Sequence, residues 1–371
     1  MRIVILIIVL LLSIAGVFLY FLLIEDKNLI DSLLKNFHKE KIIEPETNYI
    51  DTKYFKEWLH NIDFADKDLE KVKTEIHKKV IWMEEFINAI ILNILCWWNI
   101  LVEWVPGLAK TKTISTFAQV MWMEFKRIQF TPDMLPSDIT WIEIYNTKNK
   151  EFEIKLGPIV ANIILADEIN RSTPKVQSAL LEAMQEKQVT IWWETYDLPD
   201  PFFVLATQNP IEQEWTYPLP EAQVDRFLFK IIVNYPHNHD EKKVLDSIED
   251  DKKIHVKKVF WPKEFIKLKD KINKITISDE MKHYITRLIG KTREKNPNLI
   301  YGASPRWSIW LMNASRALAF IEWKDFVSHQ EIQRVALSVL RHRVVLSYNA
   351  KINWITEDEI LLDLFKEVSL I

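Results

Sequence analysis

Trp104-Val105-Pro106-Gly107-Leu108-Ala109-Lys110-Thr111 is the stretch that decides the fold of this chain. The apolar residues 99–103 directly before it predict a short buried strand. Residues 114–120 directly after it predict the opening turns of a helix. A strand, a glycine-containing loop, Lys-Thr and a helix together make the architecture of a phosphate-binding P-loop. We therefore expect Trp104 to Thr111 to bind the phosphates of a nucleotide.

The roles within this loop follow from the charge of a nucleotide. Backbone N–H groups of a tight loop and the N-terminus of a helix attract the β-phosphate. Lys110 suits the β- and γ-phosphates, and Thr111 has the hydroxyl that holds Mg²⁺. The stretch departs from G-x-x-x-x-G-K-[ST] at its two outer glycines, where it has Trp104 and Ala109. ATP and Mg²⁺ are the expected cofactors.

Composition bounds the class of protein. The chain has 371 residues, 48% hydrophobic and 27% charged, which is enough for a sizeable core and for two domains. A net charge of −4 argues against general affinity for a nucleic-acid backbone, so we expect no nucleic-acid partner. The single cysteine, Cys96, excludes a disulfide framework within the chain and favours a reducing compartment.

The N-terminal residues predict a membrane anchor. Ile3 to Ile24 is an uncharged apolar run that is long enough to span a bilayer. Several lysines follow the run closely and only Arg2 precedes it, so the positive-inside rule places the bulk of the chain in the cytoplasm. We therefore expect a single-pass protein of a bacterial-type inner membrane, with residues 1–24 as anchor and 25–61 as linker.

From residue 62 the pattern predicts an α/β domain, in which short apolar strands alternate with helices around a parallel αβα sheet. The expected strands are 99–103, 125–130, 152–156, 161–166, 202–206 and 229–233, with a hairpin at 189–196. The expected helices are 69–80, 83–95, 174–188 and 221–227, and 131–140 is expected to be a loop. After Pro236 the strand pattern ends, and amphipathic helices are expected at 279–289, 305–321 and 328–345. The expected domains are thus an ATPase core at 62–236 and an all-helical lid at 237–371.

Two carboxylates end the predicted strand 161–166. Asp167 and Glu168 follow it directly, and in P-loop proteins the first such carboxylate holds Mg²⁺ while the second polarises the attacking water. A strand terminus is also where an open α/β sheet places its ligand. Asn209, at the end of strand 202–206, could bond the attacking water or the γ-phosphate, although an Asn before a proline is also ordinary turn chemistry.

Two arginines are candidates for stabilising charge on the γ-phosphate. Arg226 lies in Asp225-Arg226-Phe227, and Arg306 ends the segment 302–306. The planar, permanently charged guanidinium suits a phosphoryl group. Taken alone, either arginine would more often form a surface salt bridge.

Several segments, in order, resemble the MoxR family of AAA+ ATPases: LADEINR (165–171), ALLEAMQE (179–186), LATQNPIEQE (205–214), TYPLPEAQVDRF (216–227) and GASPR (302–306). The resemblance implies a Walker B pair at Asp167 and Glu168 and a sensor 1 at Asn209. It also implies that Arg226 is an arginine finger acting on a neighbour's nucleotide and that Arg306 is the sensor 2 of the lid. It further implies a ring, commonly a hexamer, and chaperone-like action on client proteins, often beside partners with a von Willebrand factor A domain.

The chain contains unusually many tryptophans and unusually few glycines. The chain holds 15 tryptophans and 5 glycines, where average usage predicts on the order of 26 glycines. Tryptophans stand at positions that are similar to glycines of the family, or where a tight turn favours glycine, namely 97, 98, 104, 141, 192, 193 and 215. Our hypothesis is that UGA codons, read as glycine in the source cell, appear as tryptophan in the translated sequence.

The leading interpretation is a membrane-anchored ATPase that couples ATP hydrolysis to remodelling, maturing or assembling a partner protein. A nucleotide-binding scaffold without turnover is an alternative if Trp104 is genuine and obstructs the phosphates. A DNA-dependent ATPase is a further alternative, against which the acidic composition counts.

Overall fold

Five of the predicted strands form one parallel sheet in the order β2-β5-β8-β1-β9. A computed structural model describes residue 59 and residues 62–80, 83–104, 110–146, 150–191, 194–209, 216–233 and 254–369. All of them belong to one compact unit. The strands of the sheet are β1 (Ile100–Trp104), β2 (Phe125–Gln129), β5 (Ile163–Asp167), β8 (Phe203–Gln208) and β9 (Phe229–Val233). The parallel αβα sheet is thereby confirmed.

The first strand, β1, lies inside the sheet between the two strands that come last in the core. Ile100 pairs with Leu205 of β8 on one side and with Phe229 of β9 on the other. The buried Asn99 joins both neighbours, because its side-chain oxygen accepts from Val204 N at 2.9 Å and its carbonyl accepts from Leu228 N at 2.9 Å. Strands buried on both faces require continuous apolar runs, which is why the sequence pattern predicted them.

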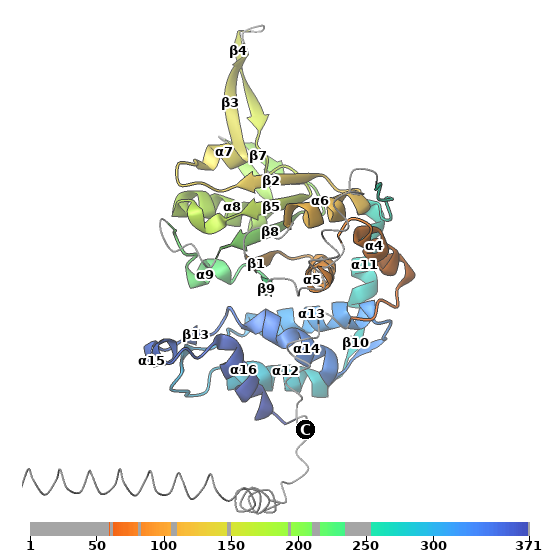
Figure 1. Cartoon of the computed structure of the whole chain (residues 1–371), viewed down its shortest axis with the longest axis vertical. Coiled ribbons are helices and arrows are strands. Elements are labelled where there is room, and N and C mark those ends of the chain that lie inside the picture. Colours follow the sequence, from red (N-terminus) through yellow and green to blue (C-terminus); the bar gives the residue numbers. More distant parts are fainter. Residues whose placement is uncertain are drawn as a thin grey trace, which may run out of the picture. The chain divides into compact units, whose positions relative to one another are not determined.

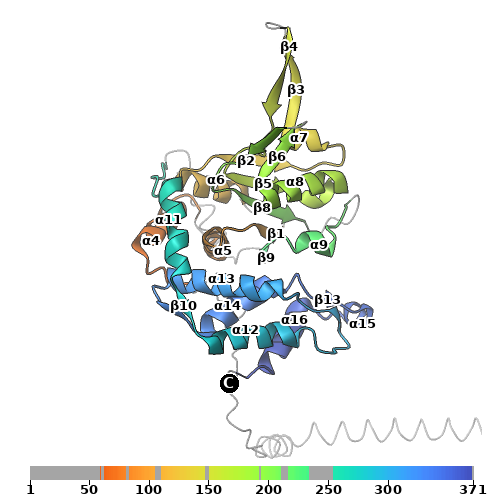
Figure 2. The ribbon, with the colours of Figure 1, turned by 180° about the vertical axis from the view of Figure 1, so that it is seen from behind.

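Helices surround the sheet (Figures 1 and 2). They are α4 (Lys67–His77), α5 (Glu84–Leu95), α6 (Lys110–Val120), α7 (Pro136–Thr140), the 3₁₀ helix η1 (Ile169–Arg171), α8 (Pro174–Glu186) and α9 (Glu221–Val224). The prediction that 131–140 is entirely loop was wrong, since α7 occupies its second half. Pro136 stands in the first turn of α7, where a missing N–H costs nothing, and Asp138 accepts from Leu135 N at 2.7 Å.

Two antiparallel hairpins extend the core. The first, β3 (Trp141–Asn146) and β4 (Glu151–Leu156), projects away from the sheet in Figures 1 and 2. Only its second strand was predicted. The other hairpin, β6 (Gln188–Ile191) and β7 (Glu194–Asp197), was predicted as such, but its turn residues 192 and 193 lie outside the described residues.

The C-terminal part is a helical body with small strand pairs, so the prediction of an all-helical lid was wrong in detail. Its helices are α11 (Pro262–Asn273), α12 (Asp279–Lys291), α13 (Arg306–Ile321), α14 (His329–Leu340), α15 (Tyr348–Ile352) and α16 (Glu357–Lys366). Its strands are β10 (Thr276–Ile277), β11 (Leu299–Tyr301), β12 (Phe326–Val327) and β13 (Val345–Leu346), paired β10–β12 and β11–β13. Strands of two or three residues are too short to produce a sequence period.

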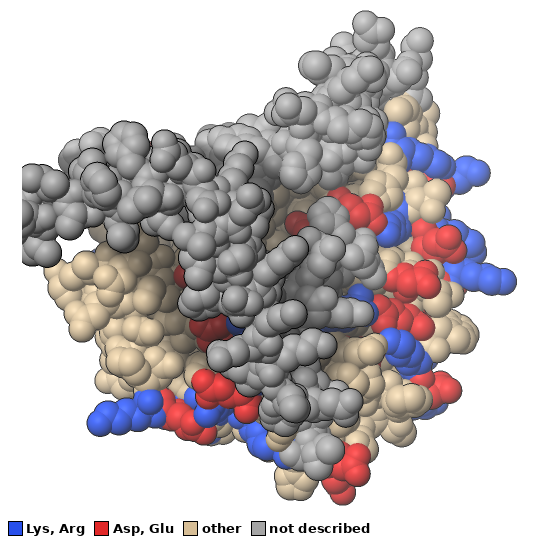
Figure 3. Space-filling view, turned by 60° about the horizontal axis from the view of Figure 1, so that its bottom comes forward, with Lys and Arg blue, Asp and Glu red and all other residues tan. Residues whose placement is uncertain are grey.

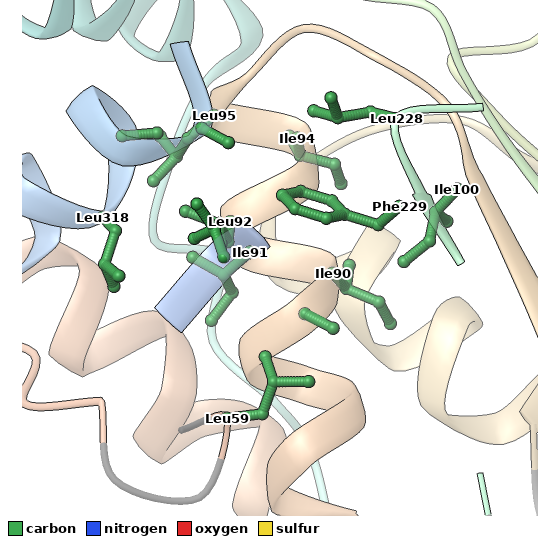
Figure 4. Close-up of a cluster of buried hydrophobic side chains, with 14 of the residues drawn as sticks. Leu59, Ile90, Ile91, Leu92, Ile94, Leu95, Ile100, Leu228, Phe229 and Leu318 are labelled. Atoms are coloured by element: carbon green, nitrogen blue, oxygen red, sulfur yellow. The ribbon is translucent and has the colours of Figure 1, made fainter. Parts of the chain in front are cut away.

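Helix α5 connects the sheet to this C-terminal body. It is apolar on nearly every face, and all residues from Phe86 to Leu95 are buried. Figure 4 shows Ile90, Leu92 and Ile94 of this helix among strand residues such as Phe229 and the α13 residue Leu318. One hydrophobic cluster therefore runs through both parts of the molecule. A helix that is apolar all round is expected to be enclosed in this way.

A second junction is polar. Arg343, just after α14, is almost fully buried and donates to the carbonyls of Phe227 and, at 3.2 Å, Leu228 at the start of β9. The ring of His342 lies 3.0 Å from the same Phe227 carbonyl. Burial, and then the charge of Arg343, hold the pKa of His342 well below its ordinary value, so its imidazole is neutral at pH 7.

No helix among the described residues is long and apolar enough to cross a membrane. The predicted anchor at 3–24 and the linker at 25–61 lie outside the described part, except for residue 59. On the face seen in Figure 3, basic and acidic side chains are interspersed over the described surface.

Candidate active site

The carboxyl ends of β1 and β5 come to one edge of the sheet, together with the start of α6. Trp104 is the last residue of β1 and Lys110 the first of α6, so the strand and helix that flank the predicted P-loop are confirmed. Residues 105–109, from Val105 through Pro106, Gly107 and Leu108 to Ala109, lie outside the described residues. The indole of Trp104 is 2% exposed and packs edge-on against Phe86 at 4.5 Å between ring centroids. Its side chain occupies the hydrophobic core, so only its backbone is available to a phosphate.

Asp167 is the central group of the site. It is 1% exposed, and the Lys110 ammonium forms an ion pair with its Oδ1. The Thr207 hydroxyl donates to the same oxygen at 2.8 Å. Arg127 donates to Oδ2 through Nε at 3.0 Å and Nη2 at 2.6 Å. Burial raises the pKa of Asp167, but the hydrogen bonds from Lys110, Thr207 and Arg127 outweigh it and leave that pKa below its ordinary value.

Glu168 follows in a left-handed conformation, with φ of 58°. Its backbone N–H donates to Thr207 Oγ1 at 3.0 Å, so one hydroxyl fixes both members of the acidic pair. Its carboxylate accepts from Gln129 Nε2 at 2.7 Å and lies 3.1 Å from Arg171 Nε. A strained backbone at a chemical site is typical of residues held for function.

Four residues of this network were not predicted from the sequence, and one of them, Arg171, follows the acidic pair in the 3₁₀ helix η1. Arg127 and Gln129 both lie on β2, two residues apart, and Thr207 lies on β8. Gln129 pairs in register with Asp167, so strand pairing places both β2 side chains on the face that reaches the acidic pair. The only available signal was polar residues at alternate positions of β2, which is equally typical of an edge strand facing solvent.

The predicted Asn209 follows β8, the strand beside β5, and is 7% exposed. Thr111, in the first turn of α6, is half-buried and comes directly after Lys110. Of the predicted site residues, Lys110 is in direct contact with Asp167, and Glu168 is the next residue of the chain.

The two predicted arginines gather elsewhere. Arg226 follows α9, and Arg306 opens α13. Both line a pocket of about 360 Å³, together with Asp225 and others. Arg226 Nη1 donates to the carbonyl of Leu181 in α8 at 3.0 Å.

The donors fit a magnesium ion held with a nucleotide. Mg²⁺ keeps several waters and takes one or two protein oxygens besides phosphate. Thr111 offers a hydroxyl, and Asp167 offers a carboxylate whose lowered pKa keeps it ionised. Within the described part of the chain, no cluster of three His, Cys, Asp or Glu side chains could hold a metal by itself.

A parallel sheet with a Lys-bearing helix start beside an acidic strand end, followed by a helical lid, defines a P-loop ATPase of the AAA+ class. Residues 99–229 match the ATPase family associated with various cellular activities (AAA), and residues 292–364 match the AAA lid domain. The chain belongs to the MoxR family of AAA+ ATPases.

Individual relatives agree with this assignment. The chain is 39% identical over 310 residues to Chaperone MoxR1 of Mycobacterium tuberculosis, covering 81% of this chain and 82% of the relative. It is 43% identical over 301 residues to the uncharacterized protein YeaC of Bacillus subtilis, covering 81% and 94%. A solved structure of a candidate ATPase from Cytophaga hutchinsonii is 43% identical, with a TM-score of 0.77, covering 81% of this chain and 94% of that one.

Proposed function

We propose that this protein hydrolyses ATP with Mg²⁺ and uses the energy to remodel, mature or assemble partner proteins. The observation that carries the proposal is the ion pair of Lys110 with the buried Asp167. This contact supports the proposal, because we expect Lys110 to bind phosphate and Asp167 to bind Mg²⁺, and the two side chains touch. One relative is named Chaperone MoxR1, which supports the chaperone-like part of the proposal.

Positioning and charge neutralisation supply the chemistry of phosphoryl transfer. Lys110 and the backbone N–H groups of residues 104–109, apart from Pro106, would hold the phosphates, and Thr111 with Asp167 would hold Mg²⁺. The bound metal ion would neutralise phosphate charge. Glu168, its backbone fixed by Thr207, would orient the attacking water, and Asn209 would bond that water or the γ-phosphate.

Arg226 would act between neighbouring subunits, and Arg306 would act between the lid and the ATPase core. Arg226 would reach a neighbour's γ-phosphate in a homo-oligomeric ring, which we propose to be hexameric. Arg306, at the start of α13, would sense the nucleotide from the lid. The client protein would include or accompany a von Willebrand factor A domain.

We further propose that residues 3–24 anchor the chain as a single-pass protein in a bacterial-type inner membrane, with the ATPase in the cytoplasm. The uncharged apolar run and the lysines that follow it support this. Cell fractionation tests this part separately: the full chain should be found with the membranes, and a variant without residues 1–24 should not.

Glu168→Gln tests the activity. We expect kcat for ATP to fall by about 10²- to 10⁴-fold, because a neutral amide cannot polarise water as a carboxylate does, while nucleotide binding is kept. Glu186→Gln, at an exposed position of α8, is the matched control and should leave kcat unchanged. A wild-type chain that binds ATP and never hydrolyses it would instead support the scaffold alternative. The trapped Glu168→Gln form should also retain bound client in a pull-down.

A further inference from the structure

Four tryptophans have a backbone conformation that large side chains resist. Within the described residues, seven non-glycine residues have positive φ, and four of them are tryptophans: Trp97 (57°), Trp122 (48°), Trp323 (58°) and Trp354 (56°). None of the described glycines, at 157, 290 and 302, has a φ in that range. Left-handed backbone brings Cβ close to the following carbonyl oxygen, so glycine is its ordinary occupant.

All four occupy the same place relative to a helix. α5 ends at Leu95, α6 at Val120, α13 at Ile321 and α15 at Ile352, and each tryptophan stands two residues later. Its N–H donates to the carbonyl three residues before it, at 2.9 to 3.3 Å for Ile94, Gln119, Phe320 and Lys351. This is the position that follows the C-cap, where glycine is strongly enriched.

Three of the four complete a Schellman motif. The residue after each tryptophan donates to the carbonyl five residues before it: Met123 to Ala118 at 2.9 Å, Lys324 to Ala319 at 2.9 Å and Ile355 to Ala350 at 3.0 Å. That pair of hydrogen bonds is what requires the left-handed residue. The Schellman hydrogen bonds are therefore complete at three separate helix ends, but tryptophan stands at the position that glycine ordinarily occupies.

The indoles of Trp97 and Trp122 stack on Phe265 and Trp261, but the other two tryptophans have little packing that would compensate for this conformation. Trp323 is 69% exposed and Trp354 is 90% exposed. By contrast, the left-handed Lys187 donates from Nζ to the Phe202 carbonyl at 2.8 Å, and the left-handed Glu168 is held in the acidic site. Those two residues have a contact that accounts for their identity.

The interior tryptophans point the same way. The indole N–H groups of Trp98 and Trp104 are buried without a hydrogen-bond partner among the described residues. A buried polar hydrogen without an acceptor is destabilising, and glycine would bring none. Trp104 also stands at the first glycine position of the P-loop pattern, so two independent kinds of observation meet there.

We infer that the functional polypeptide carries glycine, not tryptophan, at residues 97, 122, 323 and 354, and that residue 104 shares this origin. The common cause is a codon that the source cell reads as glycine and that standard translation renders as tryptophan. The inference stands on backbone geometry and does not depend on ATP hydrolysis.

Two tryptic peptides of the protein isolated from its source cells decide the matter. Ala317–Lys324 contains residue 323, and Ile352–Lys366 contains residue 354, with no other tryptophan in either. Tandem mass spectrometry should read glycine at both positions. Tryptophan at either one would overturn the inference, whatever the ATPase assay shows.

Recombinant variants test the backbone argument separately. In the full chain, Trp323→Gly and Trp354→Gly should each raise the thermal midpoint by about 2 °C. Trp323→Ala and Trp354→Ala are the matched controls, because alanine removes the indole but keeps the Cβ that opposes the left-handed backbone. Equal midpoints for glycine and alanine would contradict the geometric basis of the inference.

Discussion

Arg127 donates two hydrogen bonds to one oxygen of Asp167, Oδ2, from Nη2 at 2.6 Å and from Nε at 3.0 Å. With Lys110 on the other oxygen, both sides of this carboxylate are occupied by cationic side chains. A metal ion that binds Asp167 must therefore displace a competitor. Charge-assisted hydrogen bonds of this kind are stronger than neutral ones, although Arg127 is itself half-exposed and partly screened.

Arg127→Gln should lower the Mg²⁺ concentration that half-saturates ATP hydrolysis by about threefold, the effect of removing a partly exposed ion pair. The measurement is a Mg²⁺ titration of ATPase rate and, independently, of fluorescent-nucleotide binding. Lys126→Gln, on the neighbouring exposed position of β2, is the control and should change neither. A higher Mg²⁺ requirement in Arg127→Gln would mean that the arginine assists the metal.

The contact of Glu84 in α5 with Lys73 and His77 in α4 should be sensitive to acid. Burial raises its pKa, but hydrogen bonds with His77 and Lys73 outweigh that effect and hold the pKa at about 2, below its ordinary 4.5. His77 Nε2 lies 2.7 Å from the carboxylate. A depressed folded-state pKa gives stability that is complete above pH 4.5 and is lost as the pH falls toward 2.

We therefore expect Glu84→Gln to lower the free energy of unfolding by about 1–2 kcal/mol at pH 7, after allowance for solvent screening. The difference from wild type should shrink as urea titrations are moved below pH 4.5. Glu70→Gln, exposed on α4, serves as the comparison. A deficit that persists unchanged at pH 3 would assign the effect to packing.

Arg343 is expected to matter for stability more than any exposed arginine. Its side chain is 1% exposed and donates to the carbonyls of Phe227 and Leu228, with the Asp225 carboxylate 3.7 Å away. Arg343→Met should cost about 2–4 kcal/mol, because buried acceptors and a charge would lose their partner. Denaturant unfolding of this variant beside Arg287→Met, exposed on α12, measures the difference. Equal losses would show that the junction contributes little.

Asn99 offers a test of how β1 is held. Its side-chain oxygen accepts from Val204 N, and Asn99→Ala would leave that buried N–H without an acceptor. We expect a loss of about 1–3 kcal/mol in the free energy of unfolding. Asn349 is exposed on α15, so Asn349→Ala should leave the free energy of unfolding nearly unchanged. A neutral Asn99→Ala would indicate that the strand pairing alone sets the register.

Local patterns predicted the elements that depend on neighbouring residues. The strands β1, β5 and β8 each bury a largely apolar run, so the local pattern was enough to predict them. Lys110 and Asp167 were predicted to meet because both follow strands that end at one edge of the sheet.

Contacts across strands could not be predicted in this way. Arg127 lies on an edge strand, where a charged residue is ordinary, and only the register of β2 against β5 turns it toward Asp167. Strand β3, which begins at Trp141, was not predicted. The small strands of the lid, such as β10, have two residues and no period to detect.

The position of β1 has a consequence for synthesis on the ribosome. Asn99 and Val204 are 105 residues apart, yet they are joined in the middle of the sheet. β1 cannot take its place until β8 and β9 have left the exit tunnel, so its apolar face waits unpaired while most of the core is translated. The nascent chain would then acquire its ability to bind nucleotide late and in a single step, with ATP available as a ligand that favours the closed sheet.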